Sequence, residues 1–243
     1  INLASAKEAV VTSQTSTTII NVEKKNNDDI IYLGFDVFKE SIGLFPDIVN
    51  IGVVVNHTSN IVSVHEKKNT IASNLSDTHL IIKKIFTPEH GLKNLYQAGQ
   101  KIDRTDNYNI PIISLYGKTT TLNPEDLKNL DAMIFDVQDI GSRYYTYVST
   151  MTEVMNACAM AEIPLIIFDR PNPLGGKING PVLDLEFSSF VGMHPIPIRH
   201  GMTIGELSYM INELSWLPDS LKVDLKIIKM DGWRRDMYFK DTN

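Results

Sequence analysis

The chain has 243 residues and a mass of 27.3 kDa, and its 43% hydrophobic and 21% charged residues are typical of a folded globular protein, which excludes wholesale disorder. The 23 basic and 29 acidic residues give a net charge of −6, and no basic cluster of the kind that binds nucleic acid occurs. No apolar run approaches the ~20 residues of a membrane-spanning helix, and a single cysteine excludes an internal disulfide.

Residues 1–29 are rich in Ser, Thr, Asn and Lys and show little periodicity, so we expect a flexible N-terminal tail. Within it, Ala4-Ser5-Ala6 has the form that ends a secretory signal, although the apolar segment that should precede it is absent. An exported protein and an arbitrary chain start both fit this pattern.

From residue 30 onward, short β-rich runs alternate with helix-like stretches. The predicted strands are 30–33, 51–55, 80–86, 111–115, 132–137, 164–168 and 223–230. Most of them are apolar on both faces, which is typical of parallel strands that helices cover on both sides. The pattern predicts an α/β fold with a doubly wound, mainly parallel sheet.

Two helices have specific signals. The first carries an apolar stripe at helical spacing, formed by Val148, Met151, Met155 and Cys158. This stripe places Cys158 in the core rather than in a nucleophilic site. The second helix is expected to begin at a capping box, Thr203-x-x-Glu206, and to run through Leu214.

Ligands of open α/β sheets bind beyond the carboxyl ends of the strands, so the residues there are the candidate site. The polar residues at or just beyond five of the predicted strand ends are Asn56 and His57, Glu89 and His90, Tyr116, Asp136 to Tyr145, and Asp169 to Asn172. Carboxylates, amides, tyrosines and arginines are suited to binding a polyhydroxylated ligand and to moving protons around it.

Several other chemistries lack their motifs. No G-x-G-x-x-G or G-x-x-x-x-G-K-[ST] loop occurs, so no nucleotide cofactor is expected, and no G-x-S-x-G elbow of a serine hydrolase is present. His57, His90 and His200 could surround a metal together with Asp136 or Asp139, but their spacing is not diagnostic. We therefore expect neither a cofactor nor a metal.

Glu89 is the sharpest candidate for a general acid, because it is fixed between Pro88 and Gly91 at a strand end. A purely structural role, capping the following turn, is the alternative. Asp136 could equally bind loop amides, and Asp169 could pair with Arg170 to shape its own loop. Only six arginines occur against seventeen lysines, yet Arg143, Arg170 and Arg199 fall in loops on or near the strand ends, where a planar guanidinium could bind a ligand carboxylate.

Five motifs occur in order and carry a resemblance: TPEHG at 87–91, SLYG at 114–117, FDVQDIGSRYYTY at 135–147, DRPNP at 169–173 and RHGMTIGEL at 199–207. Together they resemble the bacterial exo-β-N-acetylmuramidase family, glycosidases that remove N-acetylmuramic acid from the non-reducing ends of peptidoglycan fragments. The resemblance implies a Rossmann-like catalytic domain without a nucleotide, with muramic-acid glycans as its partners and an exported location in a bacterium.

The resemblance also implies that Glu89 is the catalytic acid. Asp136 and Asp139 match other pocket motifs of the family, and we expect them to be catalytic carboxylates as well. The expected substrate-binding residues are Asn56, His90, Tyr116, Gln138, Arg143, Tyr145, Asp169, Arg170, Asn172 and His200. Family chains continue past the region that matches Trp233, so we expect a catalytic domain at 30–230 and, at 231–243, the start of a truncated smaller C-terminal region.

Two alternatives remain open at this point. The chain could be a non-catalytic carbohydrate-binding domain that keeps the pocket without turnover, or a metal-dependent hydrolase that uses the same strand ends. The stereochemical outcome, the substrate length and the oligomeric state do not follow from the sequence.

Overall fold

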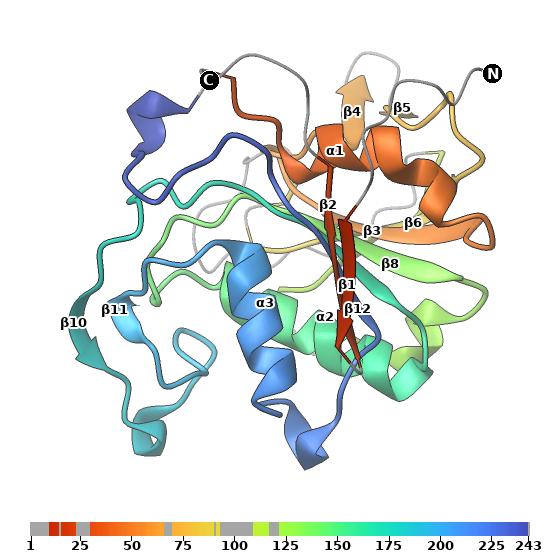
Figure 1. Ribbon diagram of the computed structural model, residues 1–243. Helices are drawn as coiled ribbons and strands as arrows, with labels where there is room; N and C mark the ends of the chain where they lie inside the picture. The colour runs from red at the N-terminus through yellow and green to blue at the C-terminus, as the bar shows by residue number, and fades with distance from the viewer. Residues whose placement is uncertain are drawn as a thin grey trace.

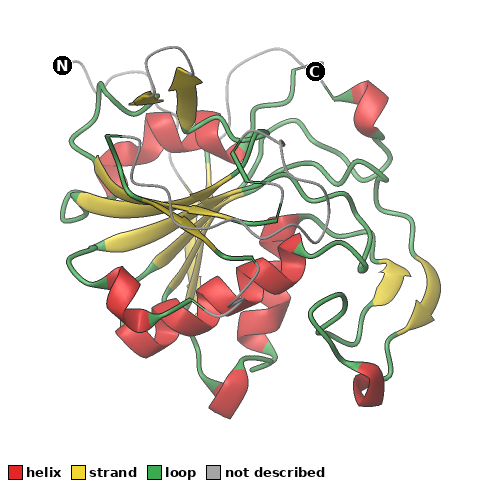
Figure 2. Ribbon diagram, turned by 180° about the vertical axis from the view of Figure 1, so that it is seen from behind, coloured by secondary structure: helices red, strands yellow, loops and turns green. Residues whose placement is uncertain are grey.

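The structure is a computed structural model that describes residues 10–14, 16–22, 30–65, 70–89, 91–92, 109–116 and 122–242. Its centre is an eight-stranded sheet with helices on both faces (Figures 1 and 2). In spatial order the strands are β1 (Val10–Gln14), β2 (Thr17–Asn21), β12 (Leu225–Ile228), β9 (Leu165–Phe168), β8 (Ala132–Asp136), β3 (Asn50–Val55), β6 (Ile81–Thr87) and β7 (Ile112–Ser114). All neighbours are parallel except β1 and β2, which confirms the predicted doubly wound, mainly parallel fold.

Three α-helices cover the sheet. Helix α1 (Gly34–Ser41) lies on one face, and α2 (Tyr147–Ala161) and α3 (Ile204–Glu213) lie on the other (Figure 2). The predicted stripe of α2 is buried, and Cys158 has no exposed surface, so its assignment to the core is confirmed. Burying each large apolar side chain contributes about 1.5–3 kcal/mol, and this contribution holds the helices against the sheet.

The other elements of the described residues are short strands and 3-10 helices. Two small antiparallel sheets, which the sequence did not predict, are formed by β4 (Val62–His65) with β5 (Thr70–Ser73) and by β10 (Asn179–Val182) with β11 (Pro197–Arg199). The 3-10 helices are η1 (Ile42–Leu44), η3 (Pro124–Leu127), η4 (Leu185–Phe187), η5 (Pro218–Ser220) and η6 (Phe239–Asp241).

The prediction of a flexible tail at 1–29 is wrong for the residues that form β1 and β2. Strand β2 pairs with β12 from Thr17↔Leu225 to Ile20↔Ile228, and Ile20 is 2% exposed. Threonine and isoleucine favour strands because their β-branched side chains pack well on a pleated surface. The Ser/Thr-rich composition therefore concealed a strand that the sheet edge stabilises.

The predicted strand at 30–33 is also wrong. This segment makes one isolated antiparallel bridge, Tyr32↔Asp231, and α1 begins immediately afterwards. The carboxyl of Asp36 accepts a hydrogen bond from the Leu33 amide at 3.0 Å and so supports the helix start. Residues 231–242 pack against the same region, with Met237 beside Ile31 and Met230.

The order of the strands creates a switch point. From β3 the chain adds β6 and β7 on one side, and it then crosses to the other side to add β8, β9 and β12. Loops that leave β3 and β8 at their carboxyl ends therefore diverge. Crevices of this kind are where open α/β sheets bind ligands.

Candidate functional site

Glu89 lies at the end of β6, one strand away from the switch point, and its side chain is nearly buried at 8% exposure. Thr146, the residue before α2, donates a hydrogen bond from its hydroxyl to Glu89 Oε2 at 3.0 Å. The pKa of the adjacent Tyr147 phenol is raised, mainly by burial, and the charge of Glu89 adds to the effect. Glu89 thus faces the start of α2.

Two further predicted residues meet Glu89 around Tyr147. Asn56, which follows β3, is 2% exposed and donates a hydrogen bond from its amide to the Tyr147 hydroxyl at 3.0 Å. The rings of Tyr145 and Tyr147 pack edge to face with their centroids 4.7 Å apart. The structure therefore brings Glu89, Asn56 and Tyr145 together beside the switch point.

Asp136, at the end of β8, is fully buried and engaged on both oxygens. Its Oδ1 atom accepts from Arg170 Nε at 2.8 Å and lies 2.6 Å from Arg170 Nη2, while its Oδ2 atom accepts from the backbone amides of Asn60 and Ile61 at 2.9 and 3.2 Å. The Arg170 side chain is 5% exposed. This buried pair joins the loops after β3, β8 and β9, so Asp136 holds these three loops together.

Asp139 and His200 form a second buried contact, with His200 Nε2 3.4 Å from Asp139 Oδ2. His200 Nδ1 accepts from the Met202 amide, which places a ring proton on Nε2, toward the carboxylate. Asp139 Oδ2 accepts from the Gly141 amide at 2.8 Å, whereas Asp139 Oδ1 and His200 Nε2 are both buried without a hydrogen-bond partner among the described residues. Asp139 thus keeps one acceptor atom uncommitted.

Gly141 is required where this loop turns. Its φ of +80° lies in the region that favours glycine, and an added Cβ would lie 2.2 Å from Asn172 Oδ1. Asn172 is itself 3% exposed and spans two loops, since it donates to the Met202 carbonyl and accepts from the Leu174 amide, both at 2.9 Å.

Asp169 follows β9 and caps the start of α3. One of its oxygens accepts from the Gly205 amide at 2.8 Å, and the other accepts from the Thr203 hydroxyl at 3.0 Å. Burial raises the pKa of Asp169 to about 7, although these hydrogen bonds act in the opposite direction. The Arg170 guanidinium pairs with Asp136 from the neighbouring strand, while the Arg170 backbone amide donates to Asp169 Oδ1 at 3.0 Å.

The remaining predicted residues are placed as follows. Gln138 donates both hydrogens of its amide group to backbone carbonyls, those of Asp139 and Pro171, at 2.7 Å each. Arg143 is 7% exposed and donates to the carbonyls of Pro181 and Ile196, at 2.9 and 2.5 Å, which ties β10 to β11. Tyr116 is half-buried after β7, and His90 lies outside the described residues.

Sequence reasoning missed Thr146 and Tyr147 as members of the site, because they lie at the start of a helix whose apolar stripe dominated the pattern. Their signal was the run Tyr144-Tyr145-Thr146-Tyr147 directly after a strand-end loop. The predicted capping box is confirmed, since Thr203 and Glu206 each accept from the other's backbone amide.

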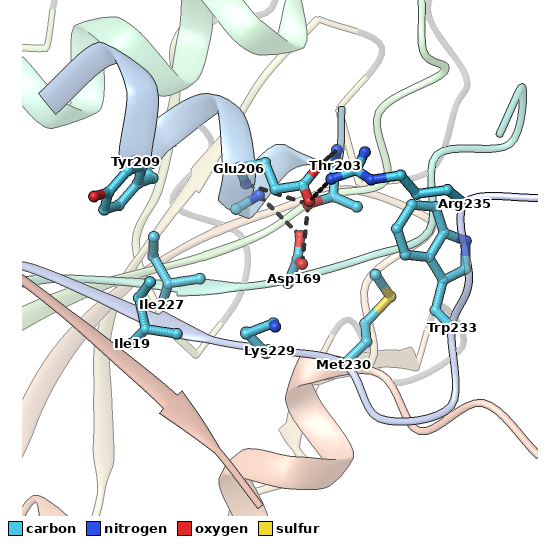
Figure 3. A pocket seen from close by; sticks show the side chains of 11 residues that line it. Ile19, Asp169, Thr203, Glu206, Tyr209, Ile227, Lys229, Met230, Trp233 and Arg235 are labelled. Carbon is cyan, nitrogen blue, oxygen red and sulfur yellow. Dashed lines mark hydrogen bonds and ion pairs between the residues drawn. The ribbon is translucent and has the colours of Figure 1, made fainter. Parts of the chain in front are cut away.

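A cavity of about 420 Å³ lies between α3 and the strands β2 and β12 (Figure 3), and Glu89 is not among the described residues that line it. Asp169 and Thr203 belong both to this cavity and to the loops described above. Its other lining residues are Ile19, Gly205, Glu206, Tyr209, Ile227, Lys229, Met230, Trp233 and Arg235. Of all these lining residues, Asp169 alone was expected from the sequence to bind a ligand.

Within the described ranges, no group of three or more His, Cys, Asp or Glu side chains is arranged to hold a metal ion. Among the same residues, no helix combines the length and the apolar character needed to cross a bilayer.

Comparisons with known proteins connect this geometry to a family. Residues 51–243 match a family described as exo-beta-N-acetylmuramidase NamZ, N-terminal. The peptidoglycan beta-N-acetylmuramidase NamZ of Bacillus subtilis (strain 168) is 47% identical over 161 residues, which are 65% of this chain and 38% of that protein.

Two crystal structures of DUF1343 family proteins from Bacteroides fragilis NCTC 9343 are similar to the chain. They have TM-scores of 0.73 and 0.69 and sequence identities of 34% and 32%. The aligned regions cover 87% and 85% of this chain but only 53% and 54% of the crystallised ones. The chain thus spans about half the length of these relatives or less. Because the family match covers far more than half of the chain, the protein belongs to the family of NamZ N-terminal domains.

Proposed function

We propose that this domain is the catalytic part of an exo-β-N-acetylmuramidase, which releases N-acetylmuramic acid from the non-reducing ends of peptidoglycan fragments, and that Glu89 is its general acid. The observation that carries the proposal is the placement of Glu89. A nearly buried glutamate stands beside the switch point, with the Thr146 hydroxyl, two tyrosines and the Asn56 amide around it. The 47% identity to the B. subtilis enzyme supports the substrate class.

Hydrolysis of a glycoside requires a carboxylic acid that donates its proton to the glycosidic oxygen as the bond to the sugar breaks. The hydroxyl of Thr146 holds Glu89 Oε2, and this contact fixes the direction of the carboxyl. Hydroxyl and amide groups around it are suited to the sugar's own hydroxyls, and the half-buried Tyr145 offers apolar surface for a ring.

In most glycosidases a second carboxylate activates water or attacks the sugar directly. Asp136 is committed to Arg170 and two amides, and Asp169 is committed to the start of α3. Asp139 retains a buried acceptor atom without a partner among the described residues. We therefore assign the second role to Asp139, with His200 as the residue that orients it.

Replacement of Glu89 by glutamine tests the proposal, because the amide keeps the shape of the side chain but carries no acidic proton. We expect Glu89→Gln to bind N-acetylmuramic acid as the parent does and to release it from a chromogenic glycoside ~10²–10⁴-fold more slowly. Glu125→Gln, an exposed glutamate that pairs with Lys128, is the matched control and should keep the parent rate.

The possible outcomes distinguish a glycosidase that uses Glu89 from a carbohydrate-binding domain and from a metal-dependent hydrolase. A near-normal rate in Glu89→Gln would remove Glu89 from the mechanism. Binding by the parent chain without any release would favour a carbohydrate-binding domain, and loss of activity in a chelator would favour a metal-dependent hydrolase.

The same proposal includes export from the cytoplasm, since the substrate class belongs to the cell wall. Fractionation of the producing bacterium and immunodetection of the chain would test it, and a purely cytoplasmic signal would contradict it.

A further inference from the structure

The cavity between α3 and β12 has the size and the lining of a ligand site, and the proposed mechanism does not use it. Its volume of about 420 Å³ falls in the range of small-molecule pockets, ~300–1,000 Å³. The carboxyl ends of β9 and β12 and the beginning of α3 enclose it, so it opens on the same edge of the sheet as Glu89.

We propose that this cavity binds a sugar unit that carries a carboxylate, namely a muramic acid residue farther along the same peptidoglycan fragment. The inference rests on the proposed function for the identity of the fragment. It adds a second binding position, with its own residues, to the one around Glu89.

The walls of the cavity suit a sugar ring. Tyr209 and Trp233 stand on opposite sides of it in Figure 3, and Ile227 and Met230 form apolar surface between them. Aromatic faces and a few placed polar groups are the usual lining of a site that takes a ring with apolar and polar sides.

Three of the four ionisable acidic and basic residues that line the cavity, Asp169, Glu206 and Arg235, already interact with other groups of the protein. Arg235 is held in place, because its guanidinium pairs with Glu206, donates to the Gly201 carbonyl at 3.0 Å and lies over the Trp233 ring with 6.0 Å between Cζ and the ring centroid. Asp169 already accepts hydrogen bonds from Thr203 and Gly205.

Lys229 is the exception among the charged lining residues. Its ammonium has no ion pair with any residue that the structure describes, and the residue is exposed at the cavity. A ligand carboxylate would supply the missing partner for this charge.

The cavity and Glu89 are too far apart to hold the same sugar. They lie at the ends of β6 and of β9 and β12, which are three and four strands apart in the sheet. At ~4.8 Å between neighbouring strands, the separation is roughly 14–19 Å. A fragment of several sugars could engage both positions, whereas a muramic acid glycoside with a small leaving group would reach only Glu89.

Trp233 offers a direct measurement of binding, because the chain has only two tryptophans and the other, Trp216, stacks on His194. We expect N-acetylmuramic acid to change the tryptophan fluorescence of the parent chain but not that of Trp233→Phe. Lys229→Met should raise the Kd from this signal ~10- to 100-fold, as expected for loss of a charge-assisted hydrogen bond. Lys226→Met is the matched control on β12, because Lys226 pairs with Asp224 and does not line the cavity.

N-acetylglucosamine, which lacks the carboxylate, should bind weakly and equally to the parent and to Lys229→Met. An absent fluorescence response, or the same Kd for N-acetylmuramic acid in the parent and in Lys229→Met, would overturn the inference.

Kinetics separate this inference from the proposed function. Lys229→Met should lower kcat/KM about tenfold or more on fragments with several muramic acid residues and leave the chromogenic glycoside unaffected. A chain that gives the fluorescence response but releases no muramic acid would refute the proposed function and keep the binding site. Release of muramic acid with no fluorescence response would do the reverse.

Discussion

Three aspartates at neighbouring strand ends are held by three different sets of donors. Asp136 is neutralised by Arg170, Asp139 contacts His200, and Asp169 has only neutral donors around it. An ionised carboxylate that is buried without a cation is disfavoured, which explains why burial raises the pKa of Asp169 to about 7.

This raised pKa predicts a dependence of stability on pH. Below about pH 4, Asp169 is protonated in both the folded and the unfolded chain. Between pH 4 and 7 the unfolded chain ionises while the folded chain keeps its proton, so the free energy of unfolding falls as pH rises, and it levels off above pH 7. At about 1.4 kcal/mol per pKa unit, the contribution that is lost is on the order of 4 kcal/mol.

Asp169→Asn should abolish this loss. Relative to the parent, the variant should be less stable at pH 4.5 and should recover most of the difference by pH 8, as measured by urea unfolding at both values. Asp131→Asn is the control, since hydrogen bonds from the Asn50 and Val49 amides lower the pKa of Asp131 and its effect should not change between pH 5 and 8. A difference for Asp169→Asn that is equal at both pH values would contradict the assignment.

For individual residues, the sequence predicted which side chains lie at the candidate site but not which of them interact with one another. Glu89, Asn56, Asp139 and His200 were identified because they follow strands or match family motifs. The partner of Arg170 was not predictable, because its contact with Asp136 depends on β8 and β9 being neighbours in register. Pairing across strands is set by the assembled sheet and leaves no local signal.

Among the elements, the start of α3 joins the helix to the site. Thr203 satisfies the Glu206 amide and at the same time donates its hydroxyl to Asp169, so one side chain caps the helix and fixes the loop after β9. Gly205 allows this close approach, because an added Cβ would lie 2.8 Å from Asp169 Cγ.

We expect Thr203→Val to lose both hydrogen bonds and to lower the free energy of unfolding by more than the ~0.5–2 kcal/mol of an ordinary N-cap. Thr203→Ser keeps the hydroxyl and should stay close to the parent. The measurement is the midpoint of urea unfolding at pH 7. Equal midpoints for the valine and serine variants would show that the hydroxyl does not hold this helix start.

Elements were predictable where burial imposes a pattern. The strands β3, β8 and β9 are apolar on both faces and were identified within one residue at each end. The small β4–β5 and β10–β11 sheets escaped detection because each of their strands has only three or four residues. In β10, all four residues are exposed, so burial imposes no pattern on them.

For the whole molecule, the N-terminal strands decide where the domain begins. Strand β2 extends the sheet beyond β12. Its Thr17 hydroxyl donates a hydrogen bond to the Glu213 carboxylate and accepts one from the Asn212 amide, and both of these residues lie near the end of α3. The domain therefore includes residues before position 30. Strand β2 also contributes Ile19 to the wall of the cavity.

Deletion of residues 1–22 should destabilise the domain. It removes the ladder between β2 and β12, exposes β12 as a new sheet edge and uncovers the apolar side chains that pack on Ile20 and Val22. We expect a lower midpoint in urea and a greater tendency to aggregate, measured by light scattering. Deletion of residues 1–9, which removes neither β1 nor β2, is the control and should leave both measurements near those of the parent. If the two deletions behaved alike, β2 would not be part of the cooperative unit, and residues 1–29 would act in solution as the tail that their composition suggested.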